Sequence, residues 1–386
     1  MAVLLCCDEV HLRIEATFKE ETLQTNLAQS AGAVAQRGNT AAQRESGAAQ
    51  PAAPRRAASP LTSQTPAAPR RGRIVQTDAA APPFRFFNSQ LLKITQLTPT
   101  MRRFTLRGAS LNQLADPGFD QRIKLVLPTA GESAAAAVEE LAAASDWYQR
   151  WSEMPEAVRP VIRTYTTREV RHCDSAPELS EVDIDAVVHT PAGPASRWVQ
   201  SAQPGDTVWL LGPNRRYSGD SGGLDFVPPP VTMWHLLAGD ETAAPAISRI
   251  LEQLPKAANG IVLLELPNPA DGAYLPHHPG FKIFVTARKD AHGEELFRLF
   301  SQNFKVRAGV TERQDPCDID VDRELLWEVP RGAAGGAELQ STGVYAWVAG
   351  EAGMVKRIRR YLIRDMGIDR RSAAFMGYWR EGRAQD

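Results

Sequence analysis

Residues 231–254 read VTMWHLLAGDETAAPAISRILEQL, and this stretch decides the fold of the second half of the chain. An apolar run ends in a turn at Gly239, and a helical pattern follows the turn. Four apolar residues recur on one face of that helix: Ile247, Ile250, Leu251 and Leu254. The stretch therefore predicts a buried strand, a tight turn and an amphipathic helix.

The same alternation continues to the end of the chain. Two continuous apolar runs come next, as is typical of parallel strands that are covered on both faces. The segments are GIVLLEL (260–266), FKIFVTA (281–287), ELFRLF (295–300), GVYAWVAGEAGMVKRIRRYLIRDMG (343–367) and AAFMGYWREG (373–382). We expect a doubly wound α/β domain over residues 231–386.

The preceding part of the chain carries short β-rich segments separated by turns. Strand-like runs such as RIKLVLP (122–128), EVDIDAVVHT (181–190) and TVWLLGP (207–213) predict a β-barrel or sandwich over residues 83–230. An Ala-rich stretch at 133–151 reads as a helix or an insertion. Residues 1–82 contain few residues that could form a core, and we expect them to be a disordered extension.

Composition excludes several classes of protein. The chain has 386 residues and a formal net charge of −1, which argues against a nucleic-acid binder. It has neither a transmembrane run nor a basic signal-peptide start. The four cysteines lack metal-ligand spacing, so we expect no metal site and a cytoplasmic location.

The segment RPVIRTYTTREV (159–170) carries the most informative polar residues. In a strand, Arg163 and Tyr165 share one face, while Thr164, Thr166 and Arg168 share the other. A guanidinium binds phosphate in a bidentate manner, and a phenol ring offers a flat surface to a planar heterocycle. The set fits a flavin with its pyrophosphate, although a solvated barrel strand would have a similar composition.

The segment HTPAGPASRWVQSA (189–202) places a Gly-Pro pair where a short helix would begin. The free amides of Ala195, Ser196 and Arg197 would then form an anion site. A purely structural helix is the alternative. In the GDET turn, by contrast, Asp240 and Glu241 would repel a pyrophosphate, and Asp240 or Thr242 reads as a helix N-cap. AGEAGMVK shares this feature through Glu351.

Together these segments resemble the siderophore-interacting proteins, which are FAD-containing ferric-siderophore reductases of the ferredoxin-reductase-like superfamily. The resemblance runs from about Pro83 to Gln385. Its carriers are WSEMPEAVRPVIRTYTTR, DIDAVVH, GPASRW, QPGD, GDETAAPAI, AGE and GYWREG. It implies a six-stranded FAD-binding barrel followed by a ferredoxin-reductase NAD(P)-binding-like domain.

The resemblance also assigns roles to residues. It implies that FAD is held by Arg163, Tyr165, Thr166, Arg168, Asp185, His189, Ala195, Ser196 and Arg197. Iron chelates of this kind are often anionic, so basic residues would attract them. The matching substrate-binding positions are Lys124, Arg215, Arg216 and Arg380, each of which could instead be a solvated surface charge.

The implied chemistry needs no catalytic protein side chain, since electrons pass through FAD to ferric iron. We expect NAD(P)H as the electron donor, with ferredoxin as the alternative, and a monomer with no membrane span. Two other functions stay open: a general NAD(P)H-dependent flavin or electron-transfer reductase, and a non-catalytic module that binds the ferric siderophore.

Overall fold

The structure, a computed structural model, describes residues 80–127, 132–188, 193–289, 291–303, 326–333 and 335–382. All of these residues belong to one compact unit of the chain. The extension expected over residues 1–82 lies, apart from its last three residues, outside the described residues.

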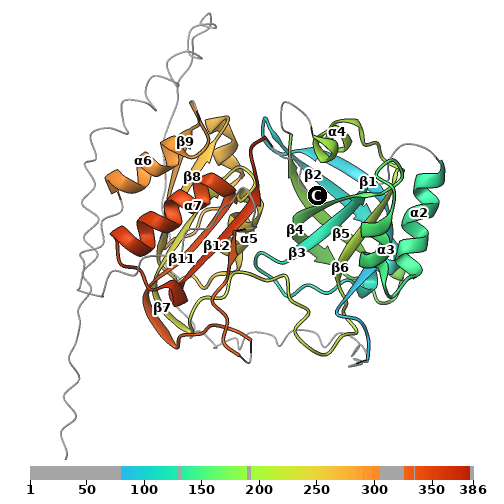
Figure 1. Cartoon of the computed structure of the whole chain (residues 1–386), viewed down its shortest axis with the longest axis horizontal. Helices are drawn as coiled ribbons and strands as arrows, with labels where there is room; N and C mark the ends of the chain where they lie inside the picture. Colours follow the sequence, from blue (N-terminus) through green and yellow to red (C-terminus); the bar gives the residue numbers. More distant parts are fainter. Residues whose placement is uncertain are drawn as a thin grey trace, which may run out of the picture. The chain divides into compact units, whose positions relative to one another are not determined.

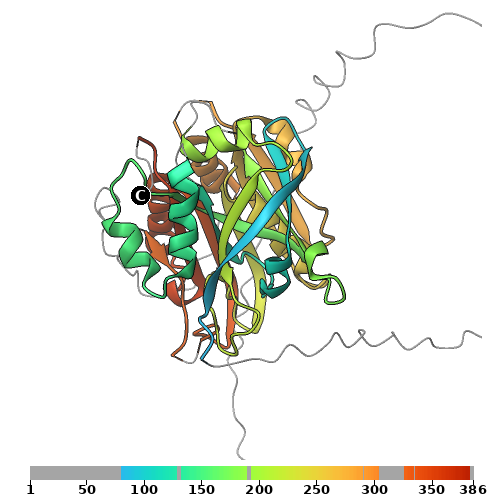
Figure 2. The ribbon, with the colours of Figure 1, turned by 90° about the vertical axis from the view of Figure 1, so that its right-hand side faces the viewer.

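Six antiparallel strands of the first half close into a barrel, in the order β1-β2-β5-β4-β3-β6 (Figures 1 and 2). The strands are β1 (Phe84–Gln96), β2 (Met101–Arg107), β3 (Arg122–Leu127), β4 (Val161–Arg171), β5 (Glu181–Val187) and β6 (Thr207–Pro213). Alternating residues such as Phe87, Leu125 and Leu210 fill the interior and are almost completely buried. This confirms the six-stranded barrel that the resemblance implied.

Two helices cover part of the outer surface of the barrel. The Ala-rich stretch forms α2 (Glu132–Ala143), and α3 (Trp147–Glu153) follows it. Val138 and Leu141 of α2 pack against Phe86 and Val126 on the barrel's outer face, in a cluster separate from the barrel core. The Ala-rich stretch is therefore an ordered helix that docks on β1 and β3 of the barrel.

A second sheet of six strands has the order β10-β12-β11-β7-β8-β9, and all its pairs are parallel except β10 with β12. Its strands are β7 (Val231–Asp240), β8 (Gly260–Leu266), β9 (Phe281–Ala287), β10 (Trp327–Glu328), β11 (Ser341–Glu351) and β12 (Ala373–Trp379). Helices α6 (Glu294–Asn303) and α7 (Ala352–Arg360) cover one face, and α5 (Ala244–Gln253) covers the other (Figure 1). The doubly wound α/β prediction is confirmed.

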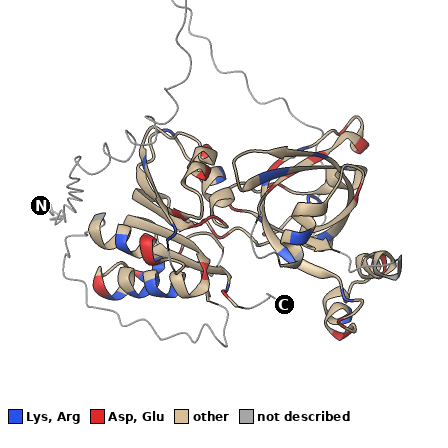
Figure 3. Cartoon of the chain, turned by 90° about the horizontal axis from the view of Figure 1, so that it is seen from above, with Lys and Arg blue, Asp and Glu red and all other residues tan. Residues whose placement is uncertain are grey.

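Shorter helical turns connect these elements. They are η2 (Ala109–Gln113), η3 (Pro177–Leu179), η4 (Pro269–Tyr274), η5 (Tyr361–Asp365) and η6 (Arg370–Ser372), together with the helix α4 (Pro194–Ser201) in the barrel half. No helix in the described ranges is long and apolar enough to cross a bilayer. Figure 3 shows Lys and Arg interspersed with Asp and Glu over the ribbon, consistent with the near-zero net charge.

Buried carboxylates join the barrel to the second half. Asp271 of η4 accepts hydrogen bonds from the hydroxyls of Thr98 and Thr100, at 2.5 and 2.6 Å. Asp120, which precedes β3, accepts from the indole Nε1 of Trp347 on β11 at 2.9 Å. Each contact places a charge from one half against donors from the other.

Candidate functional site

The first part of the site is β4, which carries the predicted cofactor residues. Arg163 pairs with Leu125 and Tyr165 pairs with Ile123, so the arginine and the tyrosine lie on the same face of the sheet. Tyr165 packs against the barrel core. Burial raises the pKa of its phenol to about 12, against the opposing charge of Arg163, so the hydroxyl stays protonated at neutral pH.

A β-bulge interrupts β4 just after these residues. The pairing with β5 shifts between Thr167 and Glu169, which leaves Arg168 as the extra residue. Simple alternation therefore cannot be carried through to Arg168, and the expected sharing of a face with Thr166 does not follow. The hydroxyl of Thr167 is buried and has no hydrogen-bond partner within the described part of the chain.

The second part of the site is the start of α4. The helix begins at Pro194 with Gly193 as its N-cap, and the cap makes no side-chain hydrogen bond. A Cβ atom added at Gly193 would meet nothing within 4 Å, so the space at the Cβ position of this residue is open. The helix packs near β4 and β5, and Ala195 lies with Tyr165 against the same core cluster.

The start of α4 offers one free amide fewer than was expected from the sequence. The amide of Arg197 donates to the carbonyl of Gly193 at 2.9 Å, which is the first hydrogen bond of the helix. Its amide is therefore not free for an anion. The amides of Ala195 and Ser196 have no acceptor within the helix, since they belong to its first turn.

FAD fits the groups that lie here. A strand presents a guanidinium and a phenol on one face, and a nearby helix start carries two first-turn amides without a side-chain cap. The orphaned hydroxyl of Thr167 is a further donor or acceptor in the same segment. Charge, ring and amides are the groups that a flavin dinucleotide requires. His189, the remaining motif residue, lies outside the described residues.

Asp185 is fully engaged with protein donors. Its buried carboxylate accepts two hydrogen bonds from Arg103, both at 2.8 Å, and one from the hydroxyl of Tyr274 at 2.6 Å. The Nε atom of Arg168 lies 3.4 Å away. Bonding to Asp185 raises the pKa of Arg103, which keeps this arginine charged. Asp185 is thus placed to hold β2, β4 and η4 together rather than to face a ligand directly.

The four predicted substrate residues are not brought into one pocket. The Nζ atom of Lys124 lies 3.3 Å from the hydroxyl of Thr164, and burial, followed by the charge of Arg122, lowers the pKa of Lys124. Arg215 forms an ion pair with Asp174 at 3.0 Å. It lines a cavity of about 510 Å³ that the other three residues do not line. Arg216 follows it in the same turn, and Arg380 follows β12.

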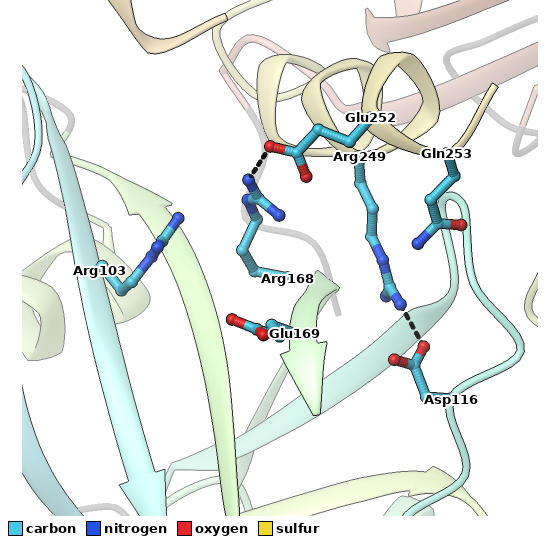
Figure 4. A pocket seen from close by; sticks show the side chains of 7 residues that line it. All are labelled: Arg103, Asp116, Arg168, Glu169, Arg249, Glu252 and Gln253. Carbon is cyan, nitrogen blue, oxygen red and sulfur yellow. Dashed lines mark hydrogen bonds and ion pairs between the residues drawn. The ribbon is translucent and has the colours of Figure 1, made fainter. Parts of the chain in front are cut away.

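A polar cavity of about 330 Å³ lies between β4 and α5 (Figure 4), and the sequence analysis did not foresee it. Its charged groups neutralise one another: Arg249 binds Asp116, Arg168 binds Glu252, and Glu169 binds Arg171. The remaining lining residues are Arg103 and Gln253. A polar stripe on an otherwise apolar helix was the available signal, because Arg249, Glu252 and Gln253 share one face of α5.

The carboxyl edge of the second sheet contains buried acids. Asp240 and Glu241 end β7, and Glu265 lies near the end of β8. Arg288 hydrogen-bonds to Glu265 at 3.1 Å and to both oxygens of Glu241. Burial, together with the charge of Asp240, raises the pKa of Glu241, while Arg288 opposes that rise.

The N-cap prediction for the GDET turn is wrong. Helix α5 begins at Ala244 with Ala243 as its N-cap, and the cap has no side-chain bond. The carboxylate of Asp240 instead accepts hydrogen bonds from the amide and hydroxyl of Thr242 within the preceding turn. Its other oxygen accepts from the amide of Glu351 and the indole of Trp379. The carboxylate therefore ties three strand ends together.

Two family models match the chain. The model described as the siderophore-interacting FAD-binding domain matches residues 90–217, and the model described as the siderophore-interacting protein matches residues 232–382. The two matches coincide with the barrel half and the α/β half of the structure.

Curated proteins and solved structures give the same result. The ferric vibriobactin reductase ViuB of Vibrio cholerae is 27% identical over 290 residues, which are 75% of this chain and 88% of that protein. The NADPH-dependent ferric-chelate reductase of Escherichia coli is 28% identical over 303 residues, 76% of this chain and 93% of that protein. The crystal structure of the siderophore-interacting protein SipS from Aeromonas hydrophila has a TM-score of 0.53 at 25% identity, covering 78% of this chain and 94% of SipS.

Proposed function

Because the chain belongs to the siderophore-interacting protein family, we propose that it is an FAD-dependent reductase that releases iron from ferric siderophores as Fe(II). The observation that carries the proposal is the strand face of Arg163 and Tyr165 beside the open start of α4. Two relatives that match along most of their length bear the names of ferric-chelate reductases, which supports the same acceptor class.

The binding residues divide the cofactor between them. Arg163 and the amides of Ala195 and Ser196 supply positive charge and N–H donors for the pyrophosphate. Tyr165 supplies a flat face for the isoalloxazine, and its protonated hydroxyl adds no charge there. Thr166, on the opposite face of β4, is buried and lies across from Arg122, and we propose it as a contact for the ring's edge.

FAD, when bound, supplies stepwise one-electron transfer to ferric iron, and the siderophore then holds the ferrous product far more weakly. The protein contributes position and charge. Lys124 lies on β3 beside Thr164 of β4, so its ammonium would attract an anionic chelate toward the strand that carries the flavin. We propose Arg216 and Arg380 as further attracting charges, with Arg215 the weakest candidate because Asp174 already binds it.

We further propose NAD(P)H as the electron donor, bound at the carboxyl edge of the second sheet, where doubly wound folds bind ligands. Gly239 packs closely against β11 at this edge, since a Cβ atom on it would lie 2.3 Å from the carbonyl oxygen of Ala349. The acids of the GDET turn would repel the dinucleotide phosphates from the start of α5. A reduced ferredoxin is the alternative donor.

A stopped-flow experiment tests the proposal. The purified chain, reconstituted with FAD, should show a flavin absorption band that bleaches with a donor and returns when a ferric siderophore is added. NADPH, NADH and reduced ferredoxin are compared as donors in separate runs. A protein that takes up no FAD would refute the proposal, and a flavin that bleaches but is not reoxidised by ferric chelates would refute the proposed acceptor.

A further inference from the structure

One face of α5 points at the strand that carries the predicted flavin residues. Arg249, Glu252 and Gln253 lie at positions i, i+3 and i+4, so they project on the same side of the helix (Figure 4). Ile247, Ile250 and Leu251 are buried in the core of the α/β half. The helix therefore serves two purposes: it covers the sheet, and it contacts the barrel through polar groups.

Arg249 makes the most deeply buried of these contacts. Its side chain is 2% exposed. One guanidinium nitrogen donates to the main-chain carbonyl of Thr167 at 2.6 Å, and another binds the carboxylate of Asp116. Since Thr167 directly follows Thr166, this hydrogen bond fixes a peptide one residue away from the predicted flavin contact.

A reciprocal contact runs in the opposite direction. Arg168, the extra residue of the β4 bulge, binds Glu252 of α5 at 2.5 Å. The bulge turns this side chain toward the helix, because it interrupts the regular alternation of the strand. Two arginines, one from each half, thus link α5 to two consecutive residues of β4, Thr167 and Arg168.

Hydrogen bonds do not satisfy every buried polar atom where α5 meets β4 in the described part of the chain. The hydroxyls of Thr167 and Ser248 and the Nε atom of Arg249 are buried without hydrogen-bond partners among the described residues. The polar cavity of about 330 Å³ lies at this same contact between α5 and β4. The β4 bulge is held by its pairing with β5 and by the bond from the amide of Thr167 to the carbonyl of Gln121 at 2.9 Å. The two arginine contacts add the links to α5, and that of Arg249 is made to the main chain itself.

We propose that Arg249 is a positioning residue, which holds the Thr167–Arg168 peptide through the Thr167 carbonyl and so fixes the neighbouring Thr166 relative to FAD. The inference rests on the proposed function. Loss of this hydrogen bond would let the bulge relax, change the contact of Thr166 with the ring, and so change how strongly the protein favours oxidised over reduced flavin. A tenfold change in that preference moves a two-electron midpoint potential by about 30 mV.

The test compares two buried arginines in the full FAD-reconstituted chain. Arg249→Met removes the contact with β4. Arg359→Met is the matched control, because Arg359 is also almost fully buried, with a 3% exposed side chain, and binds a carboxylate, Glu328, inside the α/β half. Both variants should lower the melting temperature. Only Arg249→Met should alter the visible circular dichroism of the flavin, shift its midpoint potential and slow its reduction by about ten- to a hundredfold.

A second variant covers the possibility that Arg249→Met does not fold. Arg249→Lys keeps a cation opposite Asp116 but cannot bridge to the Thr167 carbonyl with a planar fork. It should retain stability better than Arg249→Met and still shift the potential. Unchanged flavin properties in Arg249→Lys would overturn the inference.

The remaining outcomes separate the two proposals. If Arg359→Met shifted the flavin potential as much as Arg249→Met, general destabilisation would explain both, and the inference would fall. If the wild-type chain bound FAD and reduced ferric siderophore while the Arg249 variants matched it, the inference alone would fall. A wild-type chain without FAD would remove the proposed function as well.

Discussion

Helices begin in both halves of the molecule, but the first amides of α4 in the barrel half and those of α6 and α7 in the α/β half differ in their hydrogen-bond partners. In the barrel half, α4 begins after Gly193 with no side-chain cap, and the space at the Cβ position of Gly193 is open. In the α/β half, the amide of Met354 at the start of α7 donates to Glu351. The amides of Gly293 and Leu296, at the start of α6, donate to Glu265.

This difference indicates where an external anion can bind. A helix start attracts phosphate because its first amides lack acceptors and carry the positive end of the dipole. The carboxylates of Glu265 and Glu351 already take that place at α6 and α7, whereas the start of α4 leaves the place to a ligand. A doubly wound fold alone therefore does not create a phosphate-binding site. The side chains at the strand ends determine whether the first amides of a helix can bind phosphate.

The largest loss of stability should come from removing the arginine that pairs with the buried carboxylates of the second half. Arg288→Met leaves Glu241 and Glu265 buried without their cation, which should lower the free energy of unfolding by about 3–5 kcal/mol. Urea denaturation measures the loss. The double variant Arg288→Met/Glu241→Gln should recover part of it, because one of the two uncompensated charges is gone. A loss below about 1 kcal/mol would show that these acids do not need the arginine.

Asp120 extends this test to a different kind of buried acid. Its carboxylate accepts hydrogen bonds from neutral donors, whereas Glu241 and Glu265 pair with Arg288. Burial, followed by the charge of Asp225, raises its pKa to about 6. The folded state then holds a proton between about pH 4 and pH 6 that the unfolded state has lost. Stability should therefore fall by about 3 kcal/mol as the pH rises through this window.

The measurement is the free energy of unfolding at pH 4, 5, 6 and 7 for the wild type and for Asp120→Asn. The variant should lose the part of the slope that this group contributes. Identical slopes for the two proteins would contradict the raised pKa.

On the barrel side, Arg163→Ala should weaken FAD binding by about ten- to a hundredfold, the range expected for a hydrogen bond to a charged group. Fluorescence titration of the apoprotein with FAD measures the dissociation constant. Arg107→Ala is the control, because Arg107 lies on β2 and binds Glu181. Equal effects of the two variants would assign the loss to the barrel as a whole.

The smallest effect concerns one amide of α4. Ala195→Pro removes an N–H group from the first helical turn, where proline is tolerated. The dissociation constant for FAD should rise by about fivefold, equivalent to one hydrogen bond of about 1 kcal/mol. Ser196→Ala, which keeps its amide, should bind FAD more tightly than Ala195→Pro. Wild-type affinity in Ala195→Pro would show that the helix start does not hold the pyrophosphate.

The parts of the fold that could be predicted from the sequence are those that depend on local patterns of residues. The apolar runs of β8 and β9 and the period of α5 depend on residues within a few positions, so the α/β arrangement followed from them. The start of α4 was also local, because Gly193 and Pro194 mark it. The amide of Arg197 was nevertheless misassigned, since the helix closes its first hydrogen bond there.

The remaining features depend on partners far along the chain. The bulge at Arg168 is a property of the pairing between β4 and β5, which the sequence of β4 alone does not reveal. The bond from Arg249 to Thr167 joins residues 82 positions apart. Asp240 looked like an N-cap, yet its carboxylate is used by Glu351 and Trp379, which lie more than a hundred positions away. Such contacts appear only when the chain has folded.

The carboxylates that cross between the halves have a consequence for unfolding. Asp271 receives its donors from the barrel, and Asp120 receives the indole of Trp347 from the sheet, so each acid loses hydrogen bonds if the opposite half melts. Each half would then lack bonds that stabilise it in the folded chain. The barrel and the sheet should consequently melt cooperatively, in one calorimetric endotherm, and the flavin's colour should change at that same temperature.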